Sequence, residues 1–463
     1  MLNDILGKIN DFMYTYLLLF LLVGTGIYFT VRSRFAQVRL LKEGFRILTE
    51  KAEGKKQVSS FQALMISTAS RVGTGNIAGI ATAVAAGGPG AVFWMWLMAV
   101  IGGASAFIES TLAQVYKTKD GKDFRGGPSY YMEKALGKRW MGVLFSILLI
   151  ICFAYGFNGL QSYNMSSALE YYIPGYSESM YPMIVGLILA VGTGLVIFGG
   201  VHRIGFITSV MVPIMAGAYL LIGLFTIVTH IPQLPGVFAL IMSEAFDFQA
   251  ILGGMAGSAV VIGIKRGLFS NEAGMGSAPN AAASAAVSHP AKQGMVQVLS
   301  VFIDTLLICS ATAMMLLLSG VQGESGVLDG IPFVQKAISA NVGNWGIHFI
   351  TLSIFAFAFS SLIGNYYYAE SNILFIKNNK KLLFIFRITC LLAVFFGAQA
   401  DFSMMWNIAD ITMGCMATVN ILVILVLGNT AMKVLKDYEK QKKEGKNPVF
   451  KAKDVGIENT ECW

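Results

Sequence analysis

The chain has 463 residues, of which 55% are hydrophobic and only 13% are charged, and its mean hydropathy is +0.63. Soluble globular proteins have about 25% charged residues, so this composition excludes a soluble domain and indicates a polytopic membrane protein. The net charge of +8 does not indicate nucleic-acid binding, because nearly all Lys and Arg lie in the tracts 32–56, 117–139, 377–381 and 433–453. Such clustering is typical of loops on the cytoplasmic side of a membrane.

The cysteines exclude a zinc site and a disulfide framework, and the first apolar stretch does not resemble a signal peptide. The five cysteines have no CxxC spacing and four lie in apolar stretches, so neither a zinc site nor a disulfide framework is predicted. The first apolar stretch, 12–31, lacks the positive n-region and the cleavage site of a signal peptide. We therefore interpret it as a retained membrane helix.

A membrane span needs about 20 apolar residues, and on that basis about eleven helices are predicted. They cover 12–31, 60–86, 91–116, 141–168, 180–199, 206–229, 250–286, 294–319, 346–375, 382–399 and 403–428. With tract 32–56 in the cytoplasm, the N-terminus lies outside and the basic C-terminal tail lies inside.

Without the first helix, ten spans remain, and they divide into two groups of five. Because five is odd, consecutive groups have opposite orientation, as an inverted repeat requires. The predicted organisation is an N-terminal helix with a basic linker (1–56), a first repeat (57–230), a second repeat (231–430) and a basic tail (431–463). Short helices are expected at 130–136 and within 229–248 and 320–346, and the tail is expected to be solvated near anionic lipid.

Two of the spans are interrupted by glycines and polar residues. Ser67–Gly79 reads STASRVGTGNIAG, and Phe269–Ser277 reads FSNEAGMGS. In a membrane, unwound backbone persists only where it is buried in protein or lines a polar cavity. Two broken spans in corresponding positions of two halves indicate a transporter whose binding site lies at the midplane.

The first break has the chemistry of an ion site. Free amides at the start of the resumed helix, around Thr74–Ile77, favour a carboxylate. Free carbonyls at the end of the preceding half-helix, at Ala69 and Val72, suit Na+. The match to GxGxxA at Gly73–Ala78 is weak as a dinucleotide motif, because no βαβ unit surrounds it.

Polar side chains within other spans are further candidates. Arg71 and Glu272 lie at membrane depth and are expected to face each other or nearby polar groups. Ser360 and Ser361 are candidates for an oxygen cage around Na+, or for bonding back to their own helix. Gln161 and Asn164 share a helix face; a substrate contact and an interhelical hydrogen bond both remain open.

Intramembrane acids are functional candidates by default; they are Glu109, Asp304, Glu370 and Asp410. Glu370 is expected near the cytoplasmic surface, in an ion pair at the rim. The chain has no GxSxG, HExxH or Walker motif, so an enzyme or an ATP-driven pump is not predicted.

Three segments resemble the signatures of the alanine or glycine:cation symporter family: STASRVGTGNIAGIATAVAAGGPGAVFWMW, FRGGPSYYMEKALG and GLFSNEAGMGSAPNAAA. The similarity covers essentially the whole chain. It implies an all-α fold of the leucine-transporter type, with a 5+5 inverted repeat and an added N-terminal helix. It also implies Na+-driven uptake of a small neutral amino acid, alanine or glycine by default, without an organic cofactor. The location that the resemblance implies is the inner membrane of a bacterium or archaeon.

The resemblance also implies site residues. It places the substrate carboxylate at Thr74, Gly75 and Asn76, and the amine and side chain near Gln161 and the backbone of Phe269, Ser270 and Asn271. The Na+ cage would combine the carbonyls of Ala69 and Val72 with the hydroxyls of Ser360 and Ser361.

One departure from the family pattern affects substrate size. Alanine-selective relatives have a tryptophan in the eighth core helix, where this chain has Asn365 in IGNYYYAE. A smaller, polar side chain would enlarge the pocket, so glutamine or asparagine is an alternative substrate. Proton coupling through Glu109, Glu272 or Asp410 is an alternative to Na+ coupling, and an amino-acid sensor or a passive channel is an alternative to a symporter.

Overall fold

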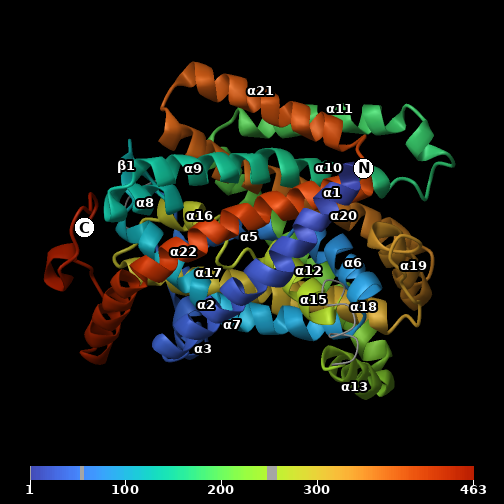
Figure 1. Cartoon of the computed structure of the whole chain (residues 1–463), viewed down its shortest axis with the longest axis horizontal. Coiled ribbons are helices and arrows are strands. Elements are labelled where there is room, and N and C mark those ends of the chain that lie inside the picture. The colour runs from blue at the N-terminus through green and yellow to red at the C-terminus, as the bar shows by residue number, and fades with distance from the viewer. Residues whose placement is uncertain (1, 53–56, 248–257) are drawn as a thin grey trace.

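The structure, a computed structural model, describes residues 2–52, 57–247 and 258–463. Nearly all regular structure is helical (Figure 1). The exception among these residues is a hairpin of β1 (Thr118–Asp120) and antiparallel β2 (Asp123–Arg125), which the sequence pattern did not predict.

Seven helical segments in the described part are long and apolar enough to cross a membrane, and Tyr181–Ile197 (α11) is a shorter apolar helix. Three of these seven segments consist of consecutive helices, and four are single helices. The seven segments are α1 (Leu2–Phe12) with η1 (Met13–Leu18) and α2 (Leu19–Arg32); α7 (Gly90–Val115); α9 (Arg139–Leu149) with η3 (Ile150–Phe157) and α10 (Asn158–Ser167); α12 (Val201–Thr229); α17 (Pro290–Phe302) with η7 (Ile303–Cys309) and α18 (Ser310–Leu317); α20 (Trp345–Ile376); and α22 (Phe402–Lys443). A total of eleven spans stays a prediction, and positions 250–257 of the expected seventh span lie outside the described residues.

The first predicted break is present. Helix α5 (Ser60–Arg71) begins with a capping box between Ser59 and Gln62. It ends where Val72 and Gly73 leave helical dihedrals, and the chain continues through the 3₁₀ turn η2 (Thr74–Asn76) into α6 (Ala78–Gly87).

The second predicted break is also present. Helix α15 (Ala259–Asn271) ends at Glu272, whose φ of 55° places a non-glycine residue in the left-handed region. Gly274 and Gly276 have φ of 83° and 87°, which L side chains rarely adopt, so glycine is required there. The chain then forms the short helix α16 (Pro279–Ser284) before α17.

The broken segments lie within the helix bundle. Helix α7 packs against α15 and α17, α5 packs against α12 and α20, and α21 (Lys380–Gly397) lies beside α11 (Figure 1). The N-terminal and C-terminal ends lie at opposite ends of the bundle in this view. Helices in the connecting stretches occur as predicted: α8 (Pro128–Leu136), α13 (Leu234–Ala245) and α19 (Gly330–Val342).

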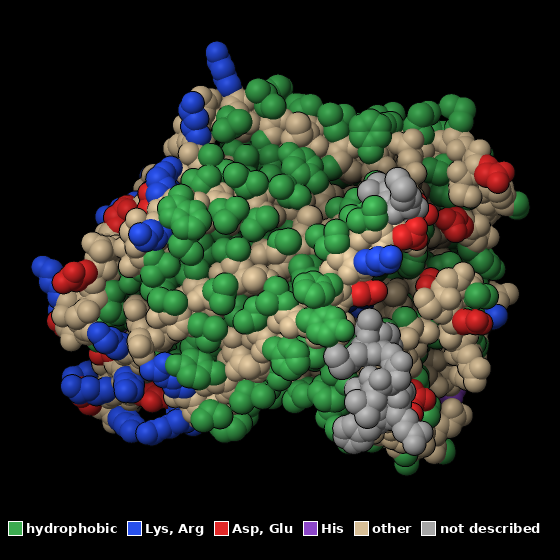
Figure 2. Space-filling view, viewed as in Figure 1, with side chains coloured by type: hydrophobic (Ala, Val, Ile, Leu, Met, Phe, Trp, Pro, Cys, Tyr) green, Lys and Arg blue, Asp and Glu red, His purple; other side chains and the backbone are tan. Residues whose placement is uncertain are grey.

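Lys and Arg gather at the end of the bundle that carries the C-terminal tail, which we call the basic face (Figures 1 and 2). There the linker helices α3 (Ala36–Arg39) and α4 (Leu41–Leu48) meet the end of α22 through the ion pairs Arg39–Glu439 and Glu43–Lys442. Burial alone would raise the pKa of Glu43, but hydrogen bonds from Arg46, Tyr438 and Lys442 lower it to about 2. The ionised carboxylate therefore ties the linker to the last helix.

The tail is the clearest error of the sequence-based prediction. Helix α22 continues to Lys443, well beyond the expected end at 428, and residues 447–463 pack against the membrane domain instead of extending into solvent. The segment contains two aromatic anchors that pack on each other, the buried Phe450 and the partly buried Trp463, while Lys451 and Lys453 stay exposed. Its short 3₁₀ turn is η8 (Ala452–Val455).

Candidate functional site

The two breaks meet in the interior of the bundle. The Nδ2 of Asn76, in the first break, donates a hydrogen bond of 3.1 Å to Ser270 Oγ, at the end of α15. The ring of Phe269 lies against Gly75 so closely that a Cβ at this position would be 2.6 Å from the ring. Glycine at 75 is therefore a steric requirement for the contact between the two halves.

Aromatic rings pack around this contact. The Phe269 ring lies 4.7 Å from the ring of Phe157 and 5.0 Å from that of Trp406, measured between centroids. The guanidinium of Arg266 lies 4.2 Å above Trp406, in a cation–π contact. The buried Trp406 Nε1 has no hydrogen-bond partner among the described residues.

The amides freed at the first break are held by side chains from α10 and from the break itself. Gly73 N donates to Asn76 Oδ1 (2.9 Å), and Thr74 N donates to Gln161 Oε1 (3.0 Å). Asn164 Nδ2 donates to Thr74 Oγ1 (2.9 Å). Gln161 and Asn164, predicted to share a helix face, thus both contact Thr74. Their helix orders the break that is the candidate carboxylate site.

Four oxygens converge beside the same break. Ser360 Oγ lies 3.5 Å from Ala69 O and 3.4 Å from Val72 O, and Ser361 Oγ lies 3.0 Å from Ala69 O. Ser360 also donates to Phe357 O of its own helix, at 2.8 Å. The cross-helix contact and the back-bond, which the sequence pattern left open as two possibilities, therefore occur together. Neutral carbonyl and hydroxyl oxygens are ligands that fit a hard monovalent cation.

Asp304, which sequence reasoning named only as one of four intramembrane acids, connects both breaks. Its Oδ1 accepts a hydrogen bond of 2.6 Å from Asn76 Nδ2, and its Oδ2 accepts from Ser270 Oγ (2.6 Å) and Thr305 Oγ1 (2.9 Å). The residue is fully buried and lies in the π-helical turn η7. Such turns often occur at functional sites, but no spacing in the sequence distinguishes Asp304 from the other acids.

Arg71 and Glu272 each have polar neighbours. Arg71 Nη1 donates to Gln297 Oε1 of α17 (3.2 Å), whereas Glu272 accepts a hydrogen bond from Ser277 Oγ (2.5 Å) and lies 3.0 Å from Ser70 Oγ, whose one proton is directed either to Glu272 or to Asn365. Within the described ranges no ion pair joins the two residues. The sequence predicted either a contact between the two residues or contacts with nearby polar groups. The hydrogen bonds are of the second kind, and a charge pair between Arg71 and Glu272 stays a prediction.

The other acids have different surroundings. Glu109 accepts hydrogen bonds from Gly274 N (3.2 Å) and Asn420 Nδ2 (2.8 Å), so it holds the second break. Glu370 forms the predicted ion pair, with Arg387 at 2.9 Å.

Asp410 pairs with Lys265 at 2.8 Å and with Arg266 at 2.6 Å. Sequence reasoning missed these two basic residues because it assigned nearly all positive charges to loops. Their position in the sequence, a few residues before the second break, could have indicated that they lie near the site.

Two asparagines among the predicted substrate ligands differ in their contacts. Asn365 Oδ1 lies 2.7 Å from Ser70 Oγ and its Nδ2 donates to Asn158 Oδ1 (3.0 Å), so the side chain links α5 to α10. Asn271 Oδ1 accepts from Ala273 N (3.0 Å), and its buried Nδ2 has no partner among the described residues.

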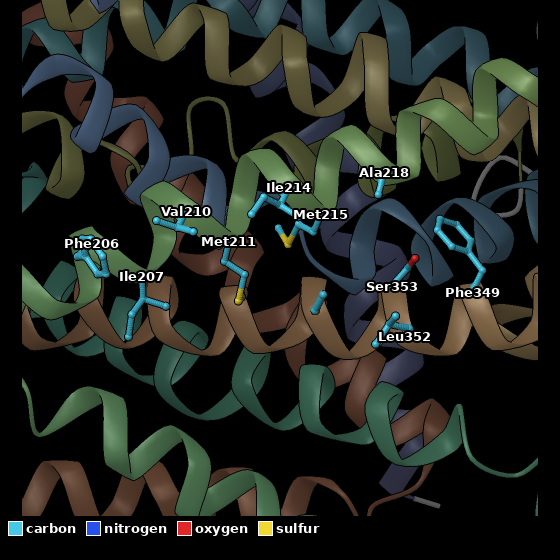
Figure 3. A pocket seen from close by; sticks show the side chains of 11 residues that line it. Phe206, Ile207, Val210, Met211, Ile214, Met215, Ala218, Phe349, Leu352 and Ser353 are labelled. Carbon is cyan, nitrogen blue, oxygen red and sulfur yellow. The ribbon is translucent and has the colours of Figure 1, made fainter.

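A large surface groove adjoins this polar centre on the outside of the bundle, and its wall residue Met215 lies between them, with Sδ 3.7 Å from Ser360 Oγ. It has a volume of about 570 Å³ and lies between α12 and α20, and its walls are almost entirely apolar (Figure 3). Phe206, Ile214 and Leu352 at its rim are each more than 60% exposed, as is typical of side chains that contact lipid. A groove without charged groups does not fit a zwitterionic amino acid.

Comparisons with known proteins agree with this geometry. Residues 1–452 match the profile of a family described as the sodium:alanine symporter family. The chain is 50% identical to the "Amino-acid carrier protein AlsT" of Bacillus subtilis, covering 100% of this chain and 97% of that protein. It is 49% identical to the "Probable sodium/glutamine symporter GlnT" of the same organism, covering 100% and 96%.

Among solved structures, MhsT in complex with L-phenylalanine superposes with a TM-score of 0.54 at 15% identity, covering 87% of this chain and 92% of MhsT. At this identity the match shows the fold alone. The predicted leucine-transporter-type fold is thus confirmed.

Proposed function

Because the chain belongs to the sodium:alanine symporter family, and is a membrane transporter rather than an enzyme, we propose that it imports alanine or glycine together with Na+. The observation that carries this proposal is the adjacency of two opposite ion sites. Val72 O belongs to the four-oxygen cluster, and Thr74 N, which the break releases from helical bonding and which donates to Gln161 Oε1, belongs to the proposed carboxylate site; only Gly73 lies between them.

The substrate carboxylate would bind the amides of Thr74, Gly75 and Asn76, at the positive end of the resumed half-helix. Gln161 Oε1, which accepts from Thr74 N, would exchange this bond for a contact with the substrate amine. The backbone of 269–271 would complete the pocket from the second break. Each half of the protein thereby contributes to one site.

Na+ would bind the carbonyls of Ala69 and Val72 and the hydroxyls of Ser360 and Ser361. The cation and the carboxylate would then attract each other across one residue in a region of low dielectric constant. Each ligand should raise the affinity of the other by the same factor. This reciprocity is the physical basis of symport.

Asp304 would contribute to coupling. It joins Asn76 to Ser270, so its charge acts on both breaks at once. Glu109, Glu272, Asp304 and Arg71 are all buried in this part of the bundle.

The contacts of Asn365 favour a small substrate. Its Nδ2 donates to Asn158 Oδ1, and its Oδ1 lies 2.7 Å from Ser70 Oγ, whose single proton is shared between Asn365 and Glu272. Protein groups therefore already contact both ends of the amide. Glutamine stays the alternative substrate, since the relatives named as an amino-acid carrier and as a glutamine symporter are almost equally similar to this chain.

Uptake into proteoliposomes tests the proposal. Radiolabelled alanine should accumulate only with an inward Na+ gradient, and unlabelled glycine should compete better than glutamine or asparagine. Ser361→Ala should raise the half-saturating Na+ concentration, whereas Ser353→Ala, on the same helix but in the lipid-facing groove, should not. Accumulation driven by a pH gradient without Na+ would contradict Na+ coupling, and superior competition by glutamine would contradict the substrate assignment.

A further inference from the structure

The tail segment 447–463 folds back onto the basic face and is fixed at both of its ends. At its start, Phe450 N donates to Ser288 O (2.8 Å), and Ser288 Oγ donates to Pro448 O (2.9 Å). Lys292 Nζ donates to Asn447 Oδ1 (3.0 Å). These bonds attach the segment to the extended stretch that joins α16 to α17.

Its other end is fixed to the loop after α7. Glu461 forms an ion pair with Lys134 (3.0 Å) and accepts hydrogen bonds from Thr118 Oγ1 and from Lys119 N (3.0 Å). Burial alone would raise the pKa of Glu461, but these donors lower it to about 2, so the carboxylate is ionised at neutral pH. Cys462 Sγ contacts Lys117 O at 3.6 Å.

Trp463 is inserted between elements that belong to different halves of the protein. Its Nε1 donates to Gln114 O of α7 (2.7 Å), and Lys117 Nζ lies 4.7 Å from the centre of its ring. The ring packs on a separate small apolar cluster, formed by Val58, Ala63, Ala285 and Val287.

This cluster joins the two broken segments on the basic face. Ala63 lies in the first turn of α5, the half-helix before the first break, and Val58 lies just before the N-cap of that helix. Ala285 and Val287 follow α16, the half-helix after the second break. The two stretches bond directly through Ala286 N and Val58 O (3.0 Å). A site between the breaks can open toward this face only if these stretches separate.

We propose that residues 447–463 form a latch that holds this face of the transport pathway closed, and that Trp463 must leave its cluster each time the pathway opens there. The proposal rests on the alternating access implied by the proposed function. The latch acts because Trp463 contacts both moving stretches, while Glu461 and Phe450 keep the segment attached on either side. Release of the ring removes apolar contacts that link α5 to α16.

Cys462 is a built-in reporter for this release. It is partly buried beside Trp463, whereas Cys152, Cys309 and Cys390 are buried inside the bundle and Cys415 lies on α22. The protein in nanodiscs would be treated with a membrane-impermeant maleimide, and labelling of the tail peptide would be followed by mass spectrometry. Cys462→Ser provides the blank. Labelling should be several-fold faster with saturating Na+ and alanine, which keep the transporter cycling, than without either ligand.

Trp463→Ala removes both the hydrogen bond to Gln114 and the apolar contacts of the ring, so it should speed labelling of ligand-free protein by more than about five- to tenfold, the factor expected from the hydrogen bond alone. It should also speed alanine exchange in proteoliposomes. Trp463→Phe, which keeps the ring but lacks the N–H, should lie between the wild type and Trp463→Ala. Trp140→Ala, at a tryptophan that is 65% exposed, is the matched control and should change neither measurement.

Equal labelling rates with and without ligands, together with wild-type exchange in Trp463→Ala, would overturn the latch. The ligand-free labelling of Trp463→Ala does not depend on transport, so it tests the docking of the tail even if the substrate or the coupling ion is wrong. A failure of Na+-driven alanine uptake would overturn the proposed function. It would not affect the interpretation of the ligand-free labelling of Trp463→Ala.

Discussion

Gly73→Ala tests whether the cation and carboxylate sites share one backbone hinge. A Cβ on Gly73 would come closer to Ser361 Oγ than real Cβ atoms do and would lie 2.9 Å from Gln161 Nε2. The backbone at 73 is extended, with φ of −130°, so the conflict is steric and not conformational. The added methyl must therefore displace one ligand of the proposed Na+ cage, one partner of the amides, or both.

Overpacking of a tight interior costs about 1–3 kcal/mol. If this strain falls on the site, the half-saturating Na+ concentration for alanine uptake should rise by about 5- to 150-fold, since each 1.4 kcal/mol is about tenfold. The assay is alanine uptake into proteoliposomes over a series of Na+ concentrations. Thermal stability in detergent would be measured in parallel to separate loss of the site from loss of the fold.

Two further variants make the outcome decisive. Gly79→Ala, in α6, is the control, because its Cβ would meet only Trp406, at an ordinary 3.5 Å. The double variant Gly73→Ala/Ser361→Ala removes the hydroxyl that the methyl meets. It should lose less than the sum of the two single losses. Wild-type Na+ dependence in a folded Gly73→Ala protein would refute the shared hinge.

Three other predictions follow from the contacts of single side chains. Asp304→Asn preserves the size of the side chain but removes its charge, so maximal uptake should fall at least about tenfold while the protein stays folded; unchanged uptake would remove Asp304 from coupling. Gln161→Ala leaves Thr74 N without its partner and should raise the KM for alanine by about 5- to 150-fold, the equivalent of about 1–3 kcal/mol, and an unchanged KM would exclude a substrate contact. Because the folded-state pKa of Glu43 is about 2 and its ordinary value is 4.5, its stabilisation is complete above about pH 5 and is lost as the pH falls toward 2; Glu43→Gln should therefore lower the melting temperature at pH 7 but not at pH 2.

The sequence by itself determined the class of the protein and the positions of its two breaks. Both follow from local chemistry: long apolar stretches form membrane helices, and glycines with polar neighbours interrupt them. The shared face of Gln161 and Asn164 was also predictable, because residues one turn apart lie on the same side of a helix. These inferences need only neighbours along the chain.

The tertiary structure decided which of the chemically similar residues belong to the site. Four intramembrane acids look alike in the sequence, yet Asp304 bridges the breaks while Asp410 and Glu370 form ion pairs elsewhere. The docking of Trp463 on Gln114 joins residues 349 positions apart, and the bond of Asn76 to Asp304 joins residues 228 positions apart. Helix periodicity determines which face a side chain occupies, but only the packing of the whole bundle determines which face it meets.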